Sequence, residues 1–224
     1  MIAAWMDSTN LKPEAKGEDI RILCEEAVYY GMTAVCIHPW RLALGKDYLA
    51  GSRVKLCTVI GFPLGAEDSA TKVFSARQAL QQGASELDMV INIGAVKDRD
   101  FVLVKQEIKS LLELKQDYNF LLKVIVETAL LDRAELEMLS RLVSESGADF
   151  IKTSTGFSTR GVSLEDIEII KSHKSESLKI KASGGVRSLD FVLQLIDAGV
   201  DRIGSSNAAS LVQEYRQRGG LLKG

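Results

Sequence analysis

Two lysines lie inside short apolar segments that are typical of buried strands. Lys152 stands in the segment 150–155 and Lys181 in the segment 179–183. Burial removes the hydration of an ammonium group and lowers its pKa, and a second ammonium nearby acts in the same direction. A neutral amine is a nucleophile toward carbonyl groups, with which it forms a Schiff base. The two lysines therefore predict carbonyl chemistry, provided that the fold brings their side chains together.

Acidic side chains and a third lysine interrupt other apolar segments. Asp7 closes the first segment, and Asp88 lies within the segment 86–92. Lys123 and Glu127 share one face of the segment 122–128. Alternate residues of a strand point to the same side, so these side chains could share one interior with the lysine pair, where acids and bases satisfy each other. A single strand lysine is more commonly an edge or solvent residue, and for Lys123 we favour a structural ion pair. Two lysines with an acid favour a functional site.

Glycine-bearing segments indicate an anion site. Gly184 and Gly185 follow the segment of Lys181, and the run Gly204-Ser205-Ser206-Asn207 opens a predicted helix. Backbone N–H groups in such turns, together with a helix N-terminus, can cradle a phosphate. Gly156, which follows Lys152 closely, could supply one more N–H. Ordinary strand-to-helix turns are the simpler interpretation, but two such segments in one fold favour phosphate.

The elements that must position these residues alternate along the chain. Helical segments end at a glycine, and a short apolar segment follows each of them. The clearest glycines are Gly31, Gly83, Gly147 and Gly199. The eight predicted strands are 3–9, 34–38, 55–61, 86–92, 122–128, 150–155, 179–183 and 202–205. Eight alternating units predict one α/β domain over residues 1–224, a closed (β/α)₈ barrel of the TIM type. A doubly wound open sheet is the alternative, although no Gly-x-Gly-x-x-Gly turn follows the first strand.

Composition excludes several other classes of protein. The 224 residues carry 28 basic and 30 acidic side chains, so we expect no nucleic-acid partner. No apolar run could span a bilayer and no secretion signal is visible, so we expect no membrane association. Cys24, Cys36 and Cys57 lack metal-ligand spacing, and the two histidines form no cluster with them. We therefore expect free thiols, a cytoplasmic protein, no metal and no cofactor.

Four segments resemble the deoxyribose-phosphate aldolases. They are Thr58-Val59-Ile60-Gly61-Phe62-Pro63-Leu64-Gly65, Glu86-Leu87-Asp88-Met89-Val90-Ile91-Asn92, Phe150-Ile151-Lys152-Thr153-Ser154-Thr155-Gly156 and Lys181-Ala182-Ser183-Gly184-Gly185. The similarity extends from Asp7 to about Ser206, and the order, spacing and strand context of the segments agree. The resemblance implies a class I aldolase on a (β/α)₈ barrel. Such an enzyme cleaves 2-deoxy-D-ribose 5-phosphate reversibly to acetaldehyde and D-glyceraldehyde 3-phosphate without a metal.

The resemblance also implies a role for individual residues. Lys152 would form the Schiff base, Lys181 would be the neighbouring ammonium that favours its neutral form, and Asp88 would transfer protons with an ordered water. The phosphate site would consist of Gly156, Gly184, Gly185, Gly204 and Ser206. Asp7, Thr9 and Lys123 would belong to the surrounding polar network. The expected partners are a phosphosugar and aldehydes, and exposed barrel helices suggest a homo-oligomer, for which we take a dimer.

The chain departs from the family pattern at four places. Ser8 stands where many members have histidine, and Phe74-Ser75-Ala76-Arg77 replaces a Phe-Glu-Thr-Lys stretch. Asn207 stands where serine or glycine is frequent, and the last tyrosine is Tyr215, whereas some members end in one. These departures bear on rate and substrate range and leave the lysine pair and the glycine segments intact.

Other functions stay open on the residues alone. One is another Schiff-base barrel, such as a transaldolase-like enzyme or an aldolase for a different phosphosugar. Another is a non-catalytic barrel that binds phosphorylated metabolites and uses its lysines only to anchor anions. A metal-dependent isomerase is the third, although the sequence offers few metal ligands.

Overall fold

The computed structural model describes residues 2–219, which form a closed barrel of eight parallel strands. Each strand pairs with the next along the chain, and β8 pairs with β1. The strands are β1 (Met6–Asn10), β2 (Ala34–Ile37), β3 (Lys55–Ile60), β4 (Glu86–Val90), β5 (Leu121–Ile125), β6 (Phe150–Lys152), β7 (Lys179–Ser183) and β8 (Arg202–Ser205). The predicted (β/α)₈ barrel is confirmed, and the open-sheet alternative is wrong.

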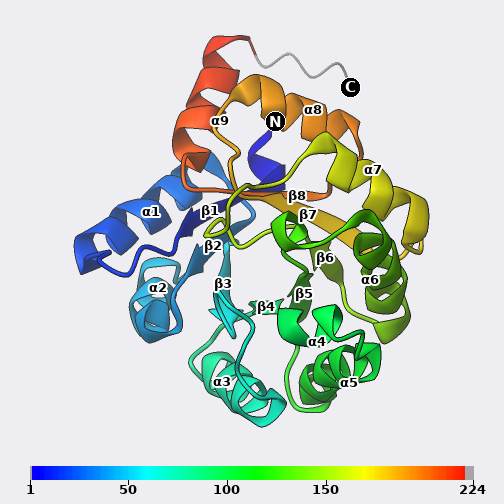
Figure 1. Ribbon diagram of the computed structural model, residues 1–224. Coiled ribbons are helices and arrows are strands. Elements are labelled where there is room, and N and C mark those ends of the chain that lie inside the picture. Colours follow the sequence, from blue (N-terminus) through cyan, green and yellow to red (C-terminus); the bar gives the residue numbers. More distant parts are fainter. Residues whose placement is uncertain (1, 220–224) are drawn as a thin grey trace.

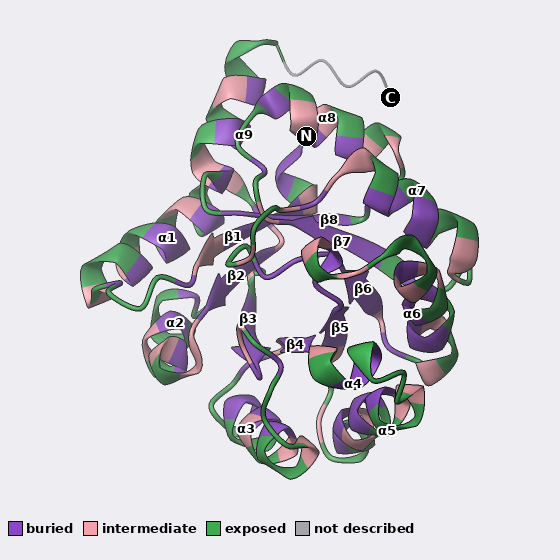
Figure 2. Cartoon of the chain, viewed as in Figure 1, coloured by how far each residue is buried: buried purple, intermediate pink, exposed green. Residues whose placement is uncertain are grey.

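Helices surround the barrel and connect its strands, as Figure 1 shows. They are α1 (Gly17–Tyr30), α2 (Leu42–Tyr48), α3 (Ser69–Gln81), α4 (Ile93–Lys97), α5 (Phe101–Leu112), α6 (Arg133–Ser146), α7 (Leu164–His173), α8 (Leu189–Asp197) and α9 (Ala208–Gln217). Short 3-10 helices are η1 (Ile2–Trp5), η2 (Pro39–Arg41), η3 (Glu113–Gln116) and η4 (Thr128–Leu130). Figure 2 shows that the buried residues lie in the strands and on the helix faces turned toward them.

Local sequence explains where the helices begin and end, and α6 illustrates this. Asp132 caps its first turn by accepting a hydrogen bond from the Glu135 N–H, which satisfies a donor that has no partner within the helix. The buried face of α6 consists of Leu136, Leu139, Ser140, Leu142 and Val143, at the three- and four-residue spacing of an amphipathic helix. The helix ends at Gly147, whose φ of 86° is the left-handed conformation that favours glycine. The other three glycines of the repeat also have positive φ, as predicted.

Three strand predictions are wrong by three residues at one end. The sixth, predicted over 150–155, is too long because β6 ends at Lys152. Residues 3–5, predicted as the start of the first strand, belong to η1, and β1 begins at Met6. An apolar run of this length does not distinguish a strand from a buried helical turn, because both hide apolar side chains. The fifth predicted strand runs to residue 128, but β5 ends at Ile125 and Thr128 opens η4. In residues 2–219, the helices are all too short or too polar to cross a membrane.

A buried ion pair fixes one of the loops that follow the strands. Lys72 of α3 and Glu107 of α5 are fully buried, with their charged atoms 2.6 Å apart. The Lys72 amine also donates to the carbonyl oxygens of Gly65 and Val90, at 2.8 and 2.9 Å. Glu107 accepts a hydrogen bond from the backbone N–H of Asn92. The pair therefore joins the loop after β3 to the end of β4.

Replacing Lys72 with methionine should destabilise the fold by about 3–5 kcal/mol, because it leaves the Glu107 carboxylate buried without its cation. Urea unfolding followed by circular dichroism measures the loss. Lys109→Met is the matched control, since Lys109 is an exposed lysine on the same helix as Glu107. It should change stability by less than about 0.5 kcal/mol. A Lys72→Met loss as small as that of the control would contradict the structural role.

Candidate active site

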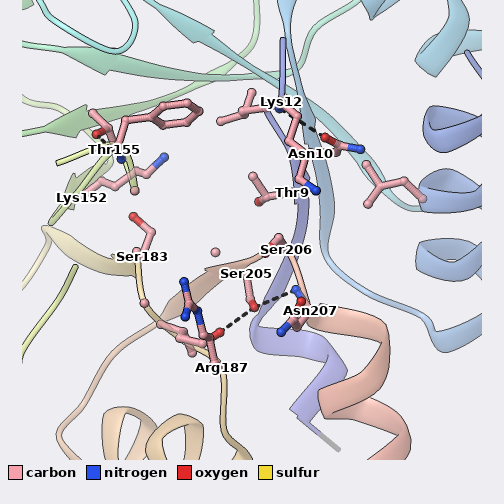
Figure 3. A pocket seen from close by; sticks show the side chains of 18 residues that line it. Thr9, Asn10, Lys12, Lys152, Thr155, Ser183, Arg187, Ser205, Ser206 and Asn207 are labelled. Atoms are coloured by element: carbon pink, nitrogen blue, oxygen red, sulfur yellow. Dashed lines mark hydrogen bonds between the residues drawn. The ribbon is translucent and has the colours of Figure 1, made fainter. Parts of the chain in front are cut away.

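A cavity of about 380 Å³ opens at the carboxyl ends of the strands. Its walls come from the ends of β1, β6, β7 and β8 and from the loops that follow them. Figure 3 shows Lys152 extending into the cavity, with Thr9 across from it and Arg187 and Asn207 toward another side. This is the face where (β/α)₈ barrels carry their active sites.

The predicted lysine pair meets at one carboxylate below this cavity. Lys152 and Lys181 occupy paired positions on β6 and β7, so both side chains point into the barrel. Their amines lie 2.8 and 2.7 Å from the same oxygen of Asp88, Oδ2. Lys152 lines the cavity and is 3% exposed, whereas Asp88 is fully buried. A small molecule in the cavity can therefore reach the amine of Lys152 while Asp88 and Lys181 support it from below.

A chain of ion pairs continues from Asp88 across the barrel. Lys181 also lies 2.6 Å from Asp7, and Arg202 contacts both Asp7 and Glu86. Lys123 closes the chain, since its amine lies 2.6 Å from Glu86 and 2.8 Å from Asp88. We call these seven residues the interior cluster; they are Asp7, Glu86, Asp88, Lys123, Lys152, Lys181 and Arg202.

The electrostatic environment holds the cluster in a charged state. Burial alone would raise the pKa of the Asp88 carboxyl, but Lys123, Lys152 and Lys181 outweigh it and hold the pKa well below its usual range. Asp7 behaves in the same way, and Lys181 and Arg202 lower its pKa to about 2. Burial alone would lower the pKa of Lys181, but Asp7 and Asp88 raise it above the ordinary lysine value. Lys181 is therefore a permanent ammonium near neutral pH.

The cluster holds one more basic group than acidic groups. Its carboxylates are three, and its basic side chains are four. Lys123, Lys181 and Arg202 each contact two of these carboxylates. Of the three carboxylates in the cluster, Lys152 contacts only Asp88, at an oxygen that Lys181 shares. Lys152 is therefore the basic side chain of the cluster with the fewest carboxylate partners.

The glycines of the predicted anion site lie together on the cavity wall. Gly156, Gly184, Gly185, Gly204 and Ser206 all line the cavity, together with Arg187. The loop after β6 crosses the loop after β7 in close contact: a Cβ placed on Gly161 would lie 2.0 Å from the Gly184 carbonyl oxygen. Gly184 has a φ of 79°, and a Cβ there would meet the Gly161 Cα at 2.9 Å. The absence of side chains therefore lets the two loops approach and presents their backbone to the cavity.

Most of the polar residues singled out in the sequence lie in or next to the cluster. Asp7 and Lys123 belong to it, and Thr9 lines the cavity with its hydroxyl donating to the Asp7 carbonyl oxygen. Glu127 lies elsewhere, because β5 ends before it and its carboxylate accepts a hydrogen bond from the Thr155 N–H at 3.1 Å. The expectation that Glu127 would share the interior with the lysines is therefore wrong.

Sequence reasoning missed two members of the cluster. Glu86 lies two residues before Asp88 on β4, and Arg202 lies two residues before Gly204 on β8. Strand alternation places both on the inward face, so the signal was present in the period of two. Each stands at the first position of its strand, where a charged side chain is easily assigned to solvent.

Two of the three cysteines also lie inside the barrel. Cys36 of β2 and Cys57 of β3 are buried, and the Cys57 thiol donates to Asp88 Oδ1 at 3.2 Å. The two sulfur atoms and a carboxylate oxygen of Asp88 lie within 4.8 Å of one another, close enough to be considered as metal ligands. Their separation along the chain gave no sign of this grouping.

A lysine that lines a cavity at the carboxyl ends of eight parallel strands is an arrangement typical of enzymes of the (β/α)₈-barrel class. Comparison with known proteins narrows this class. Residues 1–216 match the family model described as DeoC/LacD family aldolase. The chain therefore belongs to the DeoC/LacD family of aldolases, which are carbon–carbon lyases.

Individual relatives cover nearly the whole chain. The deoxyribose-phosphate aldolase of Thermococcus kodakarensis is 46% identical over 214 residues, which are 95% of this chain and 96% of the relative. The solved structure of "QR15, an Aldolase" has a TM-score of 0.91 at 38% identity and covers 98% of this chain and 97% of its own. The deoxyribose phosphate aldolase of Aeropyrum pernix, described as tetrameric, has a TM-score of 0.90 at 33% identity, with 97% and 92% coverage.

Proposed function

We propose that this chain is a class I aldolase that reversibly cleaves 2-deoxy-D-ribose 5-phosphate to acetaldehyde and D-glyceraldehyde 3-phosphate through a Schiff base on Lys152. The observation that carries the proposal is the Lys152 amine, which lines the cavity and contacts a carboxylate shared with Lys181. The name of the Thermococcus kodakarensis relative supports the choice of substrate. The chemistry uses side chains alone and no metal.

The reaction begins with the neutral Lys152 amine. Its nitrogen attacks C1 of the open-chain sugar, and loss of water gives an iminium ion. The C2–C3 bond then breaks: its electron pair moves into the iminium, the C3 hydroxyl loses its proton, and glyceraldehyde 3-phosphate departs. The remaining enamine takes a proton at C2, and water releases acetaldehyde and restores the amine.

The surplus positive charge of the cluster favours this direction of electron flow. With Lys152 neutral, the acidic and basic charges of the cluster are equal in number. The iminium formed on Lys152 is a cation and adds one net positive charge, whereas the enamine is neutral and returns the net charge to zero. Collapse of the iminium into the enamine therefore relieves a buried net charge at the step where the C–C bond breaks. Asp88, ionised and 2.8 Å from the Lys152 nitrogen, stabilises the cation and, with an ordered water, transfers the protons.

Product analysis and chemical trapping test the proposed function. Purified protein with a metal chelator present should convert 2-deoxyribose 5-phosphate to both aldehydes. Borohydride with acetaldehyde should reduce the imine and leave an ethyl group on the peptide that contains Lys152. A different aldehyde product would favour another Schiff-base aldolase or a transaldolase. Binding without turnover would favour a phosphometabolite-binding barrel, and activity that the chelator abolishes would favour metal chemistry.

The glycine loops should hold the phosphate, and Gly161→Ala tests this. The new Cβ would force the loops after β6 and β7 apart, because it would lie 2.0 Å from the Gly184 carbonyl oxygen. We expect KM for 2-deoxyribose 5-phosphate to rise by about tenfold or more, the equivalent of ~1.4 kcal/mol of binding. The rate with unphosphorylated 2-deoxyribose should change much less.

Gly17→Ala is the matched control for that variant, since a Cβ there meets its neighbours at ordinary distances of 3.5 and 3.7 Å. Initial-rate kinetics with both sugars measure the difference. An equal loss with the two sugars would show that the loops do not recognise the phosphate.

We further propose that the chain acts as a homo-oligomer, a dimer, in the cytoplasm. The tetrameric Aeropyrum pernix relative supports association of subunits, and the three free cysteines suit a reducing compartment. Light scattering coupled to size-exclusion chromatography measures the number of subunits, and a monomer at micromolar concentration would contradict the first part.

A further inference from the structure

Two thiols and a carboxylate converge beside the reactive lysine. Cys36 and Cys57 occupy paired positions on β2 and β3, and both point into the barrel. Their sulfur atoms and an oxygen of Asp88 lie within 4.8 Å of one another, and Cys57 Sγ is 3.2 Å from Asp88 Oδ1. The proposed reaction uses neither thiol. This group of two thiols and one carboxylate therefore needs a separate explanation.

The spacing of these three atoms suits a tetrahedral metal ion. Zinc lies about 2.3 Å from thiolate sulfur and about 2.0–2.2 Å from carboxylate oxygen, which places its ligand atoms roughly 3.5–4 Å apart. The three atoms need only small side-chain movements to reach this arrangement. The fourth position would remain for water, as in other sites with three protein ligands.

Charge decides which ions can enter. The surrounding cluster already holds a surplus of basic groups, so a cation that simply adds its charge is repelled. A divalent ion that displaces the protons of both thiols brings two positive charges, and the two protons carry two away. The net charge of the interior is therefore unchanged. Magnesium and calcium prefer oxygen ligands, whereas zinc and cadmium accept thiolates. The interior therefore selects for thiophilic ions.

The side chains around Cys36, Cys57 and Asp88 can accommodate such an ion, but the proposed reaction cannot proceed while it is bound. Lys123, which lies 2.8 Å from Asp88 Oδ1, keeps its second partner Glu86 at 2.6 Å when a metal takes that oxygen. Asp88, however, is the carboxylate that contacts Lys152. A metal bound to Asp88 draws away the electron density that would stabilise an iminium on Lys152, so occupancy should stop turnover.

We propose that Cys36, Cys57 and Asp88 form a buried inhibitory site for a thiophilic divalent ion of the zinc and cadmium type. The ion binds by the exchange M²⁺ + 2 RSH → M(SR)₂ + 2 H⁺, with the Asp88 oxygen as third ligand. The site regulates or poisons the aldolase and takes no part in its reaction.

Protons compete with the ion for the thiols. Cys57 faces Cys36 on β2, Asp88 on β4 and Lys123 on β5, and Lys152 and Lys181 act on Cys36. Metal affinity should therefore fall as the pH falls, since each bound ion must release two protons.

Equilibrium dialysis with Cd²⁺, in the presence of a phosphine reductant, tests binding without reference to activity. Wild type and Cys24→Ala should each bind one ion tightly and release two protons per ion into weakly buffered solution. Cys24 is the matched control because it is a buried thiol on α1, outside the cluster. Cys36→Ala and Cys57→Ala should bind at least about tenfold more weakly. Cys57→Ser, which keeps the size of the side chain, provides a second variant if the alanine protein does not fold.

The activity measurement rests on the proposed function, whereas the dialysis does not. Bound Cd²⁺ should abolish aldol cleavage in wild type and Cys24→Ala, and a chelator should restore it. Each cysteine variant is compared with its own metal-free rate, and Cys36→Ala and Cys57→Ala should resist inhibition. The proposal is overturned if wild type binds no ion, if Cys36→Ala and Cys57→Ala bind as tightly as wild type, or if binding releases no protons. Tight binding that leaves turnover intact would overturn the inhibitory role.

Discussion

Replacing Lys152 with methionine should abolish turnover and leave the fold intact. The methionine side chain keeps most of the length of lysine but cannot form an imine, so we expect kcat for 2-deoxyribose 5-phosphate to fall on the order of 10⁴-fold or more. Borohydride should no longer attach an ethyl group to the peptide around residue 152. Mass spectrometry of the trapped protein and a coupled assay for glyceraldehyde 3-phosphate measure the two effects.

Charge balance gives this variant a second expected property. Asp88 keeps Lys123 and Lys181 as partners when Lys152 is removed, and the remaining cluster holds equal numbers of acidic and basic groups. The midpoint of thermal unfolding should therefore not decrease. Lys179→Met is the matched control, since Lys179 is an exposed lysine on β7, and it should retain near wild-type kcat. Turnover above about a hundredth of wild type in Lys152→Met would require another nucleophile.

The fold was largely predictable because it depends on periodic features. Glycines at helix ends, apolar strand segments and their alternation with helices required no knowledge of contacts across the barrel, and they predicted all eight strands. The wrongly predicted strand ends lie where the apolar pattern covers only a few residues. Residues 3–5 resemble a strand in composition but form a 3-10 turn, and Glu127 lies beyond the end of β5 because the backbone there has a positive φ of 54°.

Site residues were predictable where the family resemblance and the alternation of side chains along a strand both indicated them. They were less predictable where their contacts depend only on which strands lie side by side. Asp88 and the two lysines follow from both. Arg202 and Glu86 could have followed from alternation, but their ion pair joins residues on β8 and β4 that no local pattern connects. Cys36 and Cys57 meet only because β2 and β3 pair in that register. The surplus of one basic group over the acidic groups emerges only when the whole cluster is assembled.

Lys181→Met should reduce activity near neutral pH and move the pH dependence of the rate toward alkaline values. Without Lys181, the three carboxylates face only Lys123 and Arg202 as permanent cations, and a proton on Lys152 restores the balance. A neighbouring ammonium favours the neutral form of an amine, so its removal leaves less free amine near neutral pH. We therefore expect kcat/KM at pH 7 to fall by about 100-fold and to recover as the pH rises. Steady-state rates between pH 6 and about 10 measure the profile.

The double variant Asp7→Asn/Lys181→Met separates charge balance from simple loss of contacts. Asp7 and Lys181 form one ion pair at 2.6 Å, so their joint removal leaves two carboxylates, Glu86 and Asp88, facing Lys123 and Arg202. Lys152 can then be neutral without a net charge, and the alkaline displacement of the pH profile should largely disappear even if kcat does not return fully. If Lys181 served only to hold Asp88 in place, Lys181→Met would lower the rate equally at every pH, and the second substitution would lower it further. The pH profiles of wild type, single and double variants thus distinguish an electrostatic role for Lys181 from a structural one.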